Sequence, residues 1–572
     1  MRFYRLALIL IAVLPVCFDF AWAQVPPAEV IRRNEQIQRR QQDNLDDRRQ
    51  RIIEQQDQGI SGVQPQPLSE QDGEKNACID VVSIKLEGIT VYNPSRFDGQ
   101  IAQIVGRCAS LHEINTLVRE VTNTYIDDGY ITTRAFIRPD GVGEGALHVA
   151  VLEGRVEEVS GFEGSTFGNA RLVTAFPFIE GGLLNLRDLE QGIDQLNRLA
   201  SIDATLDIQP GEVAGASHVV VKHKTIGRPY RFTLNVDNNG QQSTGRVVHT
   251  AGLEVDSPFG LNDFWSVYYS RDARYSKVTG TEAFGGFFSL PFGHTTLSIS
   301  GGKSNYDSVI TGSFENFASK GSSWNILGEI DQVLFRDGKT KISAAPFIQI
   351  FNAENFIEDV RLLSSSYRLS ILGARLKGQR TVLGGILSGQ AEAQWGANIL
   401  GAEAVDLGPE SPDTEFTSVA FTTSFFKPLE LFGFKFRYNT LLRGEWNFDA
   451  VFPVIRISLG GPATVRGFRD DGISGRRGLF NRHEISKDLL EFGGEGVLPT
   501  TQILGYLGYD WGGILANNDD PFERGVLHST TFGLRTLGGP FFLDLGVSVP
   551  ISSPQFVEHR DVEVSASLRL TF

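Results

Sequence analysis

From about Arg228 to its last residue, the chain alternates apolar and polar positions in segments separated by Gly, Asn, Asp and Ser. In the final segment DVEVSASLRLTF (561–572), every second residue from Val562 to Phe572 is apolar, and the residues between are Glu, Ser, Arg and Thr. FFLDLGVSVPI (541–551) and PYRFTLNVDNNG (229–240) repeat this pattern. Because successive side chains of a strand point to opposite faces, each segment predicts a β-strand with one apolar and one polar face.

A soluble sandwich would also alternate, but these segments are long and their apolar face is rich in Phe, Tyr and Trp. Their polar face carries glycines and charges, and an apolar exterior around a polar interior is typical of an outer-membrane barrel. Divided over sixteen strands, residues 229–572 give about 21 residues for each strand with its connection. Fourteen or eighteen strands fit as well. We predict a transmembrane antiparallel β-barrel of about sixteen strands over 225–572, surrounded by outer-membrane lipids.

Residues 78–224 predict two successive units with the order β-α-α-β-β, at 78–154 and 155–224. The first unit has helix patterns near 94–105 and 111–128 and a turn at PDGVGEG (139–145), and the second has helix patterns near 168–176 and 186–199. Similar order at similar length indicates an architectural repeat. The exposed edges of such small sheets either bind an extended peptide by strand addition or pack only against each other.

The stretch 28–56 contains neither Pro nor Gly and is rich in Arg, Gln and Glu, which favours a helix. Its apolar stripe is thin: Val30, Ile37, Leu45 and Ile52. Such a helix is solvated, bridges domains or pairs as a coiled coil. At about 43 Å it is long enough to thread a water-filled pore, and a periplasmic spacer is the alternative. We assign 24–56 to this helix and the Gly-, Pro- and Ser-containing stretch 57–77 to a flexible linker.

Residues 1–23 predict a secretory signal peptide. Arg2 and Arg5 precede a short apolar run, and AWA ends the segment at Ala23 with the small residues that a signal peptidase requires. Two further cysteines, Cys78 and Cys108, then lie in an exported chain, where a disulfide is the simplest interpretation and two buried thiols the alternative.

The net charge is −15, and removing the signal makes the chain more acidic by one unit. An acidic chain argues against nucleic acid as a partner. Neither a complete phosphate loop nor an H-E-x-x-H zinc pair occurs in the sequence. We therefore expect no enzyme activity, no cofactor and no metal site, and a function in binding and passage.

Several short motifs accompany this order of elements. Besides Cys78 and Cys108 they are YIDDGYITTRAFI (125–137), RDLEQGIDQLNRL (187–199), FGLND (259–263), VRGF (465–468), SGRRGLFNRHE (474–484) and GYDWG (508–512). Together they resemble the outer-membrane transporters of two-partner secretion (TpsB), the haemolysin activation and secretion type of the Omp85 superfamily. The resemblance covers nearly the whole mature chain, although residues 300–430 share only the alternating strand pattern and no motif.

The resemblance implies two periplasmic POTRA domains, a sixteen-stranded barrel in the bacterial outer membrane, and an N-terminal helix that plugs the pore. It also implies a loop near 460–485, folded back into the barrel, with Val465, Arg466, Gly467 and Phe468 at its tip. The implied partner is a secreted exoprotein, an adhesin or haemolysin, whose secretion domain is recognised by the POTRA domains. The aromatic C-terminus, Phe572, is assigned to recognition by the barrel assembly machinery.

The resemblance also gives Arg466 a counter-charge, Asp510. The alternation in ILGYLGYDWGG (503–513) independently places Asp510 on the lumen face, with Gly508 and Gly512 on the same face. Glycines there let another backbone approach closely. Asp470 and Asp471 are nearer in sequence and are the rival partners.

The function that we predict is secretion of one partner exoprotein across the outer membrane without ATP. The alternative is an Omp85-type insertase that assembles other barrel proteins, since the V-R-G-F loop occurs in both groups. A passive porin would account for the barrel but not for the two periplasmic domains.

Overall fold

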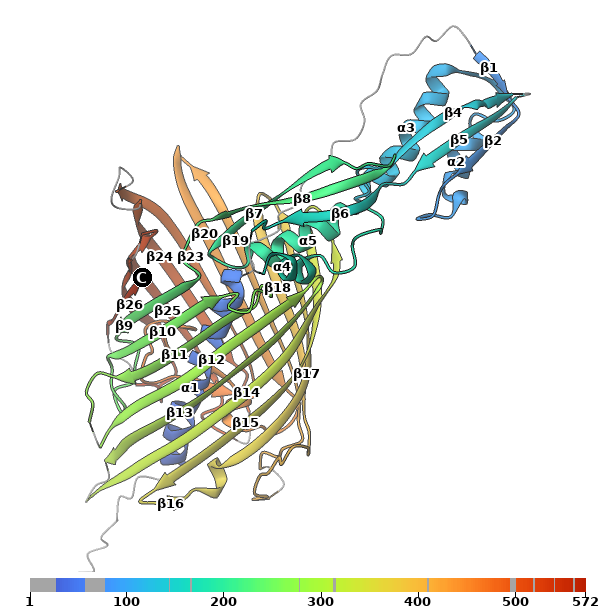
Figure 1. The fold of residues 1–572 in the computed structure, drawn as a ribbon. Coiled ribbons are helices and arrows are strands. Elements are labelled where there is room, and N and C mark those ends of the chain that lie inside the picture. The colour runs from blue at the N-terminus through green and yellow to red at the C-terminus, as the bar shows by residue number, and fades with distance from the viewer. Residues whose placement is uncertain are drawn as a thin grey trace, which may run out of the picture.

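The computed structural model describes residues 27–56 and 78–572, apart from short gaps at 144, 165–166, 277, 312–314, 409–410, 494–499, 518–519, 540 and 559–560. A barrel encloses an N-terminal helix, and two small domains extend from one rim of the barrel (Figure 1). The predicted signal peptide (1–23) and linker (57–77) lie outside the described residues. In the part of the chain that is described, no helix combines the length and the apolar character needed to span a membrane.

Sixteen antiparallel strands close the barrel within the described residues, and the first, β9, pairs with the last, β27. The predicted class of fold and the strand number are therefore confirmed. A further two-residue strand, β16 (Val360–Arg361), only extends β15 at its edge. The sixteen strands are β9 (Tyr230–Asp237), β10 (Val248–Asp256), β11 (Phe264–Asp272), β12 (Gly280–Phe292), β13 (Thr295–Thr311), β14 (Asn316–Arg336), β15 (Thr340–Ile357), β17 (Tyr367–Val382), β18 (Gly385–Gly396), β19 (Thr417–Leu431), β20 (Phe434–Asn447), β23 (Arg477–Phe492), β24 (Thr501–Ile514), β25 (Gly525–Leu537), β26 (Phe541–Ser552) and β27 (Glu563–Thr571).

Exposure alternates along the strands as the sequence predicts. In β9 the apolar residues from Tyr230 to Val236 are exposed, and the polar residues between them are half-buried. Two-residue turns join β12 to β13, β17 to β18 and β19 to β20 at the rim that carries the small domains, and longer loops lie at the other rim. The apolar exterior and polar interior are those of a membrane barrel.

The first small domain contains one more pair of strands than the sequence predicts. Its main sheet has the order β2-β5-β4, and β1 pairs with β3 in a separate two-stranded sheet. Strand β4 also continues to Gly143, through most of the predicted turn at 139–145, because its pairing with β5 is interrupted by a bulge after Ile137 and resumes at Val142 and Gly143. The elements are β1 (Cys78–Val81), β2 (Ser83–Glu87), η1 (Pro94–Phe97), α2 (Asp98–Ala102), β3 (Arg107–Ser110), α3 (Leu111–Asp127), β4 (Arg134–Gly143) and β5 (Ala146–Leu152).

Local contacts fix the start of α3 and the side sheet of this domain. Ser110 and Glu113 form a capping box, in which each side chain accepts a hydrogen bond from the other residue's backbone N–H. Hydrogen bonds from Ser110 and Arg107 lower the pKa of Glu113 to about 2. A disulfide joins Cys78 to Cys108, with a Cα–Cα distance of 5.4 Å, and so links β1 to β3.

The second small domain follows the predicted order and sits directly on the barrel rim (Figure 1). Its sheet has the order β6-β8-β7, and its core is built around buried leucines of α5 and the segments beside it. Barrel residues Phe264 and Phe287 belong to the same buried cluster, so this domain and the barrel share a core. The elements are β6 (Arg155–Gly161), α4 (Gly168–Ala175), α5 (Leu186–Asn197), β7 (Ile202–Pro210) and β8 (Ala216–Thr225).

Candidate functional site in the barrel lumen

An inward hairpin, residues 448–476, connects β20 to β23 and folds back against the inner wall. It contains η3 (Pro453–Ile455), β21 (Ile457–Leu459) and β22 (Ile473–Gly475), and β21 pairs with β22. The hairpin ends before the predicted bound of 485, because Arg477 already pairs with Trp446 in the wall. Its apolar residues form one buried cluster with wall residues of β23, β24 and β25: Ile457, Leu459, Val465, Phe468, Ile473, Phe480, Ile514 and Leu527.

Arg466 lies at the tip of this inward hairpin and faces Asp510 of β24. Its Nε is 2.7 Å from Asp510 Oδ2, and its Nη2 is 2.8 Å from Oδ1. The backbone N–H of Arg466 also donates to Oδ2, at 3.1 Å. Asp510 is fully buried. This two-pronged geometry fixes the direction of the arginine as well as its charge.

Two glycines make room for the arginine. A Cβ at Gly508 would lie 2.2 Å from Arg466 Nη2, so any side chain there would displace the guanidinium. Gly467 has a φ of +101°, which side-chain-bearing residues rarely adopt, and a Cβ there would lie 3.3 Å from Ser529 and 3.4 Å from Pro550 of the wall. Close approach of the hairpin therefore depends on glycine both in VRGF and in GYDWG.

The ion pair continues into a network that sequence reasoning missed. Arg466 Nη1 donates to Glu484 of β23 at 3.2 Å, and Glu484 also accepts from Arg535 of β25 at 2.8 Å. Arg535 in turn donates to Asp544 of β26 at 2.8 Å. Glu484 lies within the motif SGRRGLFNRHE, and the parity of β23 and β25 would have placed it and Arg535 inside the barrel.

Arg482 supports the same tip from β23. Its Nη1 donates to the carbonyl oxygen of Ala463 at 2.9 Å, and its Nε lies 3.7 Å from Asp510 Oδ1. Asp510 therefore faces two arginines, one from the inward hairpin and one from the wall.

The rival carboxylate Asp470 has a different partner. It forms an ion pair with Arg246 and accepts a hydrogen bond from the backbone N–H of Gln242 at 3.0 Å. Beside it, Arg469 donates to the carbonyl oxygens of Asn238 (2.9 Å) and Val564 (2.7 Å). The tip of the inward hairpin is thus attached to β24 through Arg466 and to the segments around the β9–β27 junction through Arg469.

Phe572 lies at that same junction, at the opposite end of β27. Its backbone exchanges hydrogen bonds with Phe232 of β9, at 2.9 and 3.2 Å, and the two rings lie 6.5 Å apart on the outer surface. The last residue of the chain thus closes the barrel.

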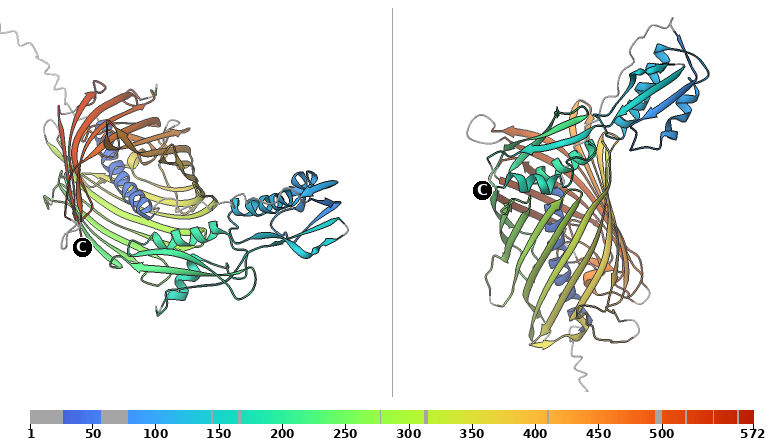
Figure 2. Two further views of the ribbon diagram at one scale, coloured as in Figure 1. Left: turned by 90° about the horizontal axis from the view of Figure 1, so that it is seen from above. Right: turned by 45° about the vertical axis from the view of Figure 1, so that its right-hand side comes forward.

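Helix α1 (Pro27–Gln56) occupies the lumen, as the view along the barrel shows (Figure 2). Its polar side chains form hydrogen bonds with several wall strands: Gln38 with Asn355 (2.9 Å), Gln41 with Ser304 (2.9 Å) and Thr281 (3.0 Å), Gln42 with Asn325 (3.1 Å), and Arg48 with Thr250 (2.9 Å). Of the predicted apolar stripe, Ile37 is buried and Ile52 packs towards the shared core, and the side chains of Val30 and Leu45 lie outside the described residues.

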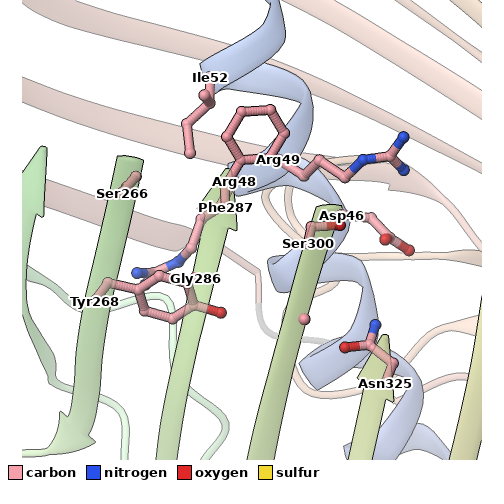
Figure 3. A pocket seen from close by; sticks show the side chains of 11 residues that line it. Asp46, Arg48, Arg49, Ile52, Ser266, Tyr268, Gly286, Phe287, Ser300 and Asn325 are labelled. Carbon is pink, nitrogen blue, oxygen red and sulfur yellow. The ribbon is translucent and has the colours of Figure 1, made fainter. Parts of the chain in front are cut away.

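A small pocket remains between the helix and strands β11 to β14 (Figure 3). The Arg48 guanidinium lies 4.5 Å from the ring centre of Tyr268, and Asp46, Ser300 and Asn325 line the space beside it. The pocket is thus lined both by polar side chains and by the apolar Ile52 of the helix and Phe287 of β12.

Arg49 joins a group of wall charges that is already paired. Its Nη2 lies 2.9 Å from Glu329 Oε2, and Glu329 also binds Arg375 and, at 2.7 Å, Lys377, both of β17 on the far side of β15. Removing Arg49 would leave Glu329 with two cationic partners from the wall.

Comparison with known proteins gives consistent matches. Residues 215–536 match the family described as haemolysin secretion/activation protein ShlB/FhaC/HecB, 79–154 match a POTRA domain of the ShlB type, and 155–210 match a POTRA domain. The chain is 30% identical over 531 residues to the outer membrane transporter CdiB of Escherichia coli, covering 91% of this chain and 87% of that protein. It is 30% identical over 448 residues to the hemolysin transporter protein ShlB of Serratia marcescens, covering 77% of each. The solved structure of CdiB from Escherichia coli superposes with a TM-score of 0.85 at 29% identity, over 94% of this chain and 98% of that one.

Proposed function

This chain belongs to the ShlB/FhaC/HecB family of haemolysin secretion/activation proteins, and we propose that it secretes one partner exoprotein through its lumen. The barrel lies in the bacterial outer membrane and its POTRA domains lie in the periplasm. In the proposed mechanism the POTRA domains bind the secretion domain of the exoprotein. The unfolded chain then passes through the barrel without ATP.

The main support for the proposal is that a polypeptide segment, helix α1, already occupies the lumen. Helix α1 is a 30-residue polypeptide whose polar side chains form hydrogen bonds with β10 and with β12 to β15 of the wall. A helix with its side chains is about 10–12 Å wide, so a lumen that accommodates α1 accommodates an extended chain once α1 has left. The donors and acceptors that bind α1 would then serve the backbone of a passing chain.

The POTRA domains offer edges at which an extended segment could be bound. In the first domain β2 and β4 form the two edges of the main sheet, and in the second β6 and β7 do so. Strand addition at such an edge binds the main chain through its hydrogen bonds and tolerates many side-chain sequences. That mode suits a partner that arrives unfolded.

The inward hairpin is proposed to form a fixed part of the path. Arg466, Asp510 and Glu484 keep its tip against the wall strands β23 and β24. The hairpin would thereby set the free width of the lumen and present a constant surface to the moving chain.

Translocation into sealed vesicles tests the proposal. The purified protein is inserted into liposomes, and the unfolded secretion domain of a candidate exoprotein is added on the POTRA side without nucleotide. We expect protease-protected exoprotein inside the vesicles, and none with liposomes that lack the protein. An unprotected exoprotein, or accelerated insertion of other barrel proteins into the same liposomes, would contradict transport and favour the insertase alternative.

A further inference from the structure

Phe178 of the second POTRA domain is exposed in an unusual way. It lies in the loop after α4 and is 92% exposed, although most of its neighbours in the loop are buried or half-buried. Its φ is +58°, a left-handed conformation in which a bulky residue is strained. The backbone therefore turns this ring outward, against both its local preference and its hydrophobicity.

The loop itself is firmly seated on the barrel. The backbone N–H of Gly293, in the β12–β13 turn, donates to the carbonyl oxygen of Thr174 at 2.8 Å. Pro177 packs on Gly293 so closely that a Cβ there would lie 2.7 Å from the proline ring. Phe178 is thus held at a fixed height at the periplasmic rim.

At that height the ring of Phe178 meets the lipid-facing surface of the barrel. Its centre lies 5.9 Å from the ring of Phe292, edge to face, and Phe292 is the last outward residue of β12. The outward aromatics continue sideways from Phe288 to Trp265, with ring centres 4.6 Å apart, and from Trp265 to Phe259, 5.8 Å apart. Aromatic side chains concentrate where a barrel crosses the boundary between acyl chains and headgroups.

We propose that Phe178 inserts into the periplasmic leaflet of the outer membrane and anchors the second POTRA domain to the lipid. The lipid is the occupant that the structure favours, because Phe178 prolongs the existing lipid-facing row instead of forming a separate patch. A periplasmic domain would then have three kinds of attachment at the rim: the core shared with Phe264 and Phe287, the polar contacts of α5, and one side chain in the bilayer.

The contacts of α5 with the barrel indicate why insertion of Phe178 would affect the orientation of the second POTRA domain. Buried Arg336 at the end of β14 binds Gln191 and Asp194, and Arg198 donates to Ser289 Oγ at 3.0 Å. These contacts attach the inner side of the domain to the barrel. Phe178 would restrain its outer side, so that the domain could not tilt about α5.

Site-directed spin labelling tests the proposal directly. The mature chain has no cysteine besides the disulfide pair Cys78–Cys108, so Phe178→Cys can be labelled alone with a nitroxide. Val213→Cys is the matched water control, because Val213 is 69% exposed in the β7–β8 turn of the same domain. Leu297→Cys, on the outer face of β13, is the lipid control. Heat-modifiable gel mobility verifies that each labelled barrel is folded.

The measurement compares collisions of the label with oxygen, which enters lipid, and with a soluble nickel chelate, which does not. In vesicles of phosphatidylethanolamine and phosphatidylglycerol we expect the oxygen-to-nickel ratio at 178 to exceed that at 213 severalfold and to approach that at 297. A ratio at 178 equal to that at 213 would overturn the proposal. The same low ratio, followed by immobilisation of the label only when an exoprotein is added, would also overturn it and would identify the exoprotein as the occupant.

Discussion

The inward hairpin and helix α1 both lie inside the barrel, but different forces hold them there. The hairpin buries an apolar cluster and places Arg466 on a fully buried carboxylate through a side-chain fork and a backbone N–H. The helix forms separate polar contacts with several strands, and its described apolar attachments are the buried Ile37 and, near its C-terminal end, Ile52 and Ile53. Each helix contact is a separate hydrogen bond worth about 0.5–1.5 kcal/mol, whereas removing one partner of a buried ion pair costs about 3–5 kcal/mol.

The charges of the wall show the same difference. Arg466 of the hairpin forms the short two-pronged ion pair with Asp510, whereas Arg482 of the wall lies 3.7 Å from that carboxylate. Glu329 meets Arg49 of the helix but keeps Arg375 and Lys377 when the helix is absent. The wall is thus electrostatically incomplete without the hairpin and nearly complete without the helix. We infer that the hairpin is a permanent part of the lumen and that the helix is a removable one.

Replacing Arg466 should have the largest effect. Arg466→Ala leaves Asp510 without its main partner and Glu484 with Arg535 alone, and an unpaired buried charge costs about 3–5 kcal/mol when it is fully desolvated. We expect the hairpin to leave the wall and secretion to fall by at least about tenfold, measured as exoprotein in the medium at equal barrel abundance.

Arg246→Ala is the matched control for that change, because Arg246 binds Asp470 of the same hairpin at a more exposed position. Exposed pairs contribute about 0–1 kcal/mol, so secretion by this variant should stay near normal. Equal losses of secretion in the two variants would contradict a special role for Arg466.

Deleting the helix should affect conductance more than stability. Without residues 27–56 the lumen loses its polar occupant, and we expect the conductance in planar bilayers to rise severalfold. The midpoint of thermal unfolding should shift by only a few degrees, because most lost contacts are separate hydrogen bonds of about 0.5–1.5 kcal/mol each and Glu329 keeps two cations of the wall. Unchanged conductance would favour the periplasmic spacer and contradict a helix that blocks the pore.

A pair of single substitutions sharpens the comparison at Glu329. Arg49→Ala should lower the free energy of unfolding by less than about 1 kcal/mol, because Arg375 and Lys377 remain on the carboxylate. Arg375→Ala removes a buried wall partner that also binds Glu392, and should cost about 2–3 kcal/mol. Denaturant unfolding of the reconstituted barrel would measure both, and the reverse order would contradict a removable helix.

Periodicity predicts most of this fold, and it also places Asp510 in the lumen. Strand parity depends only on neighbouring residues, so the faces of β9, β24 and β27 can be read from the sequence. The same parity would have placed Glu484 and Arg535 beside Asp510, had the pattern of β23 and β25 been followed.

Contacts made by irregular segments could not be predicted in this way. Asp470 binds Arg246, which lies more than two hundred residues away in another loop, and no local pattern links them. The inward hairpin ends where β23 begins to pair with β20, at Arg477 and Trp446, and this long-range pairing leaves no local sequence signal. Neither the left-handed backbone of Phe178 nor its place beside Phe292 of the barrel follows from its sequence neighbours.

Glu484 also changes how the ion pair should be tested. Exchanging the charges of positions 466 and 510 would place an aspartate beside Glu484 and an arginine beside Arg482. Failure of that exchange would therefore not disprove the pair. A test that leaves these charges in place is more direct.

The most direct test of a fixed hairpin and a removable helix is to restrain each of them in turn. Gln41→Cys with Thr281→Cys, joined by a short reducible thiol cross-linker, would hold α1 to β12, where the two side chains now lie 3.0 Å apart. Asp470→Cys with Arg246→Cys, joined in the same way, would hold the hairpin to the segment before β10, where these two side chains form an ion pair. We predict that the helix cross-link abolishes translocation until it is reduced, with the unsubstituted protein unaffected by the reductant, and that the hairpin cross-link leaves translocation unchanged. Normal translocation with the helix still cross-linked, or a block caused by the hairpin cross-link alone, would contradict the account.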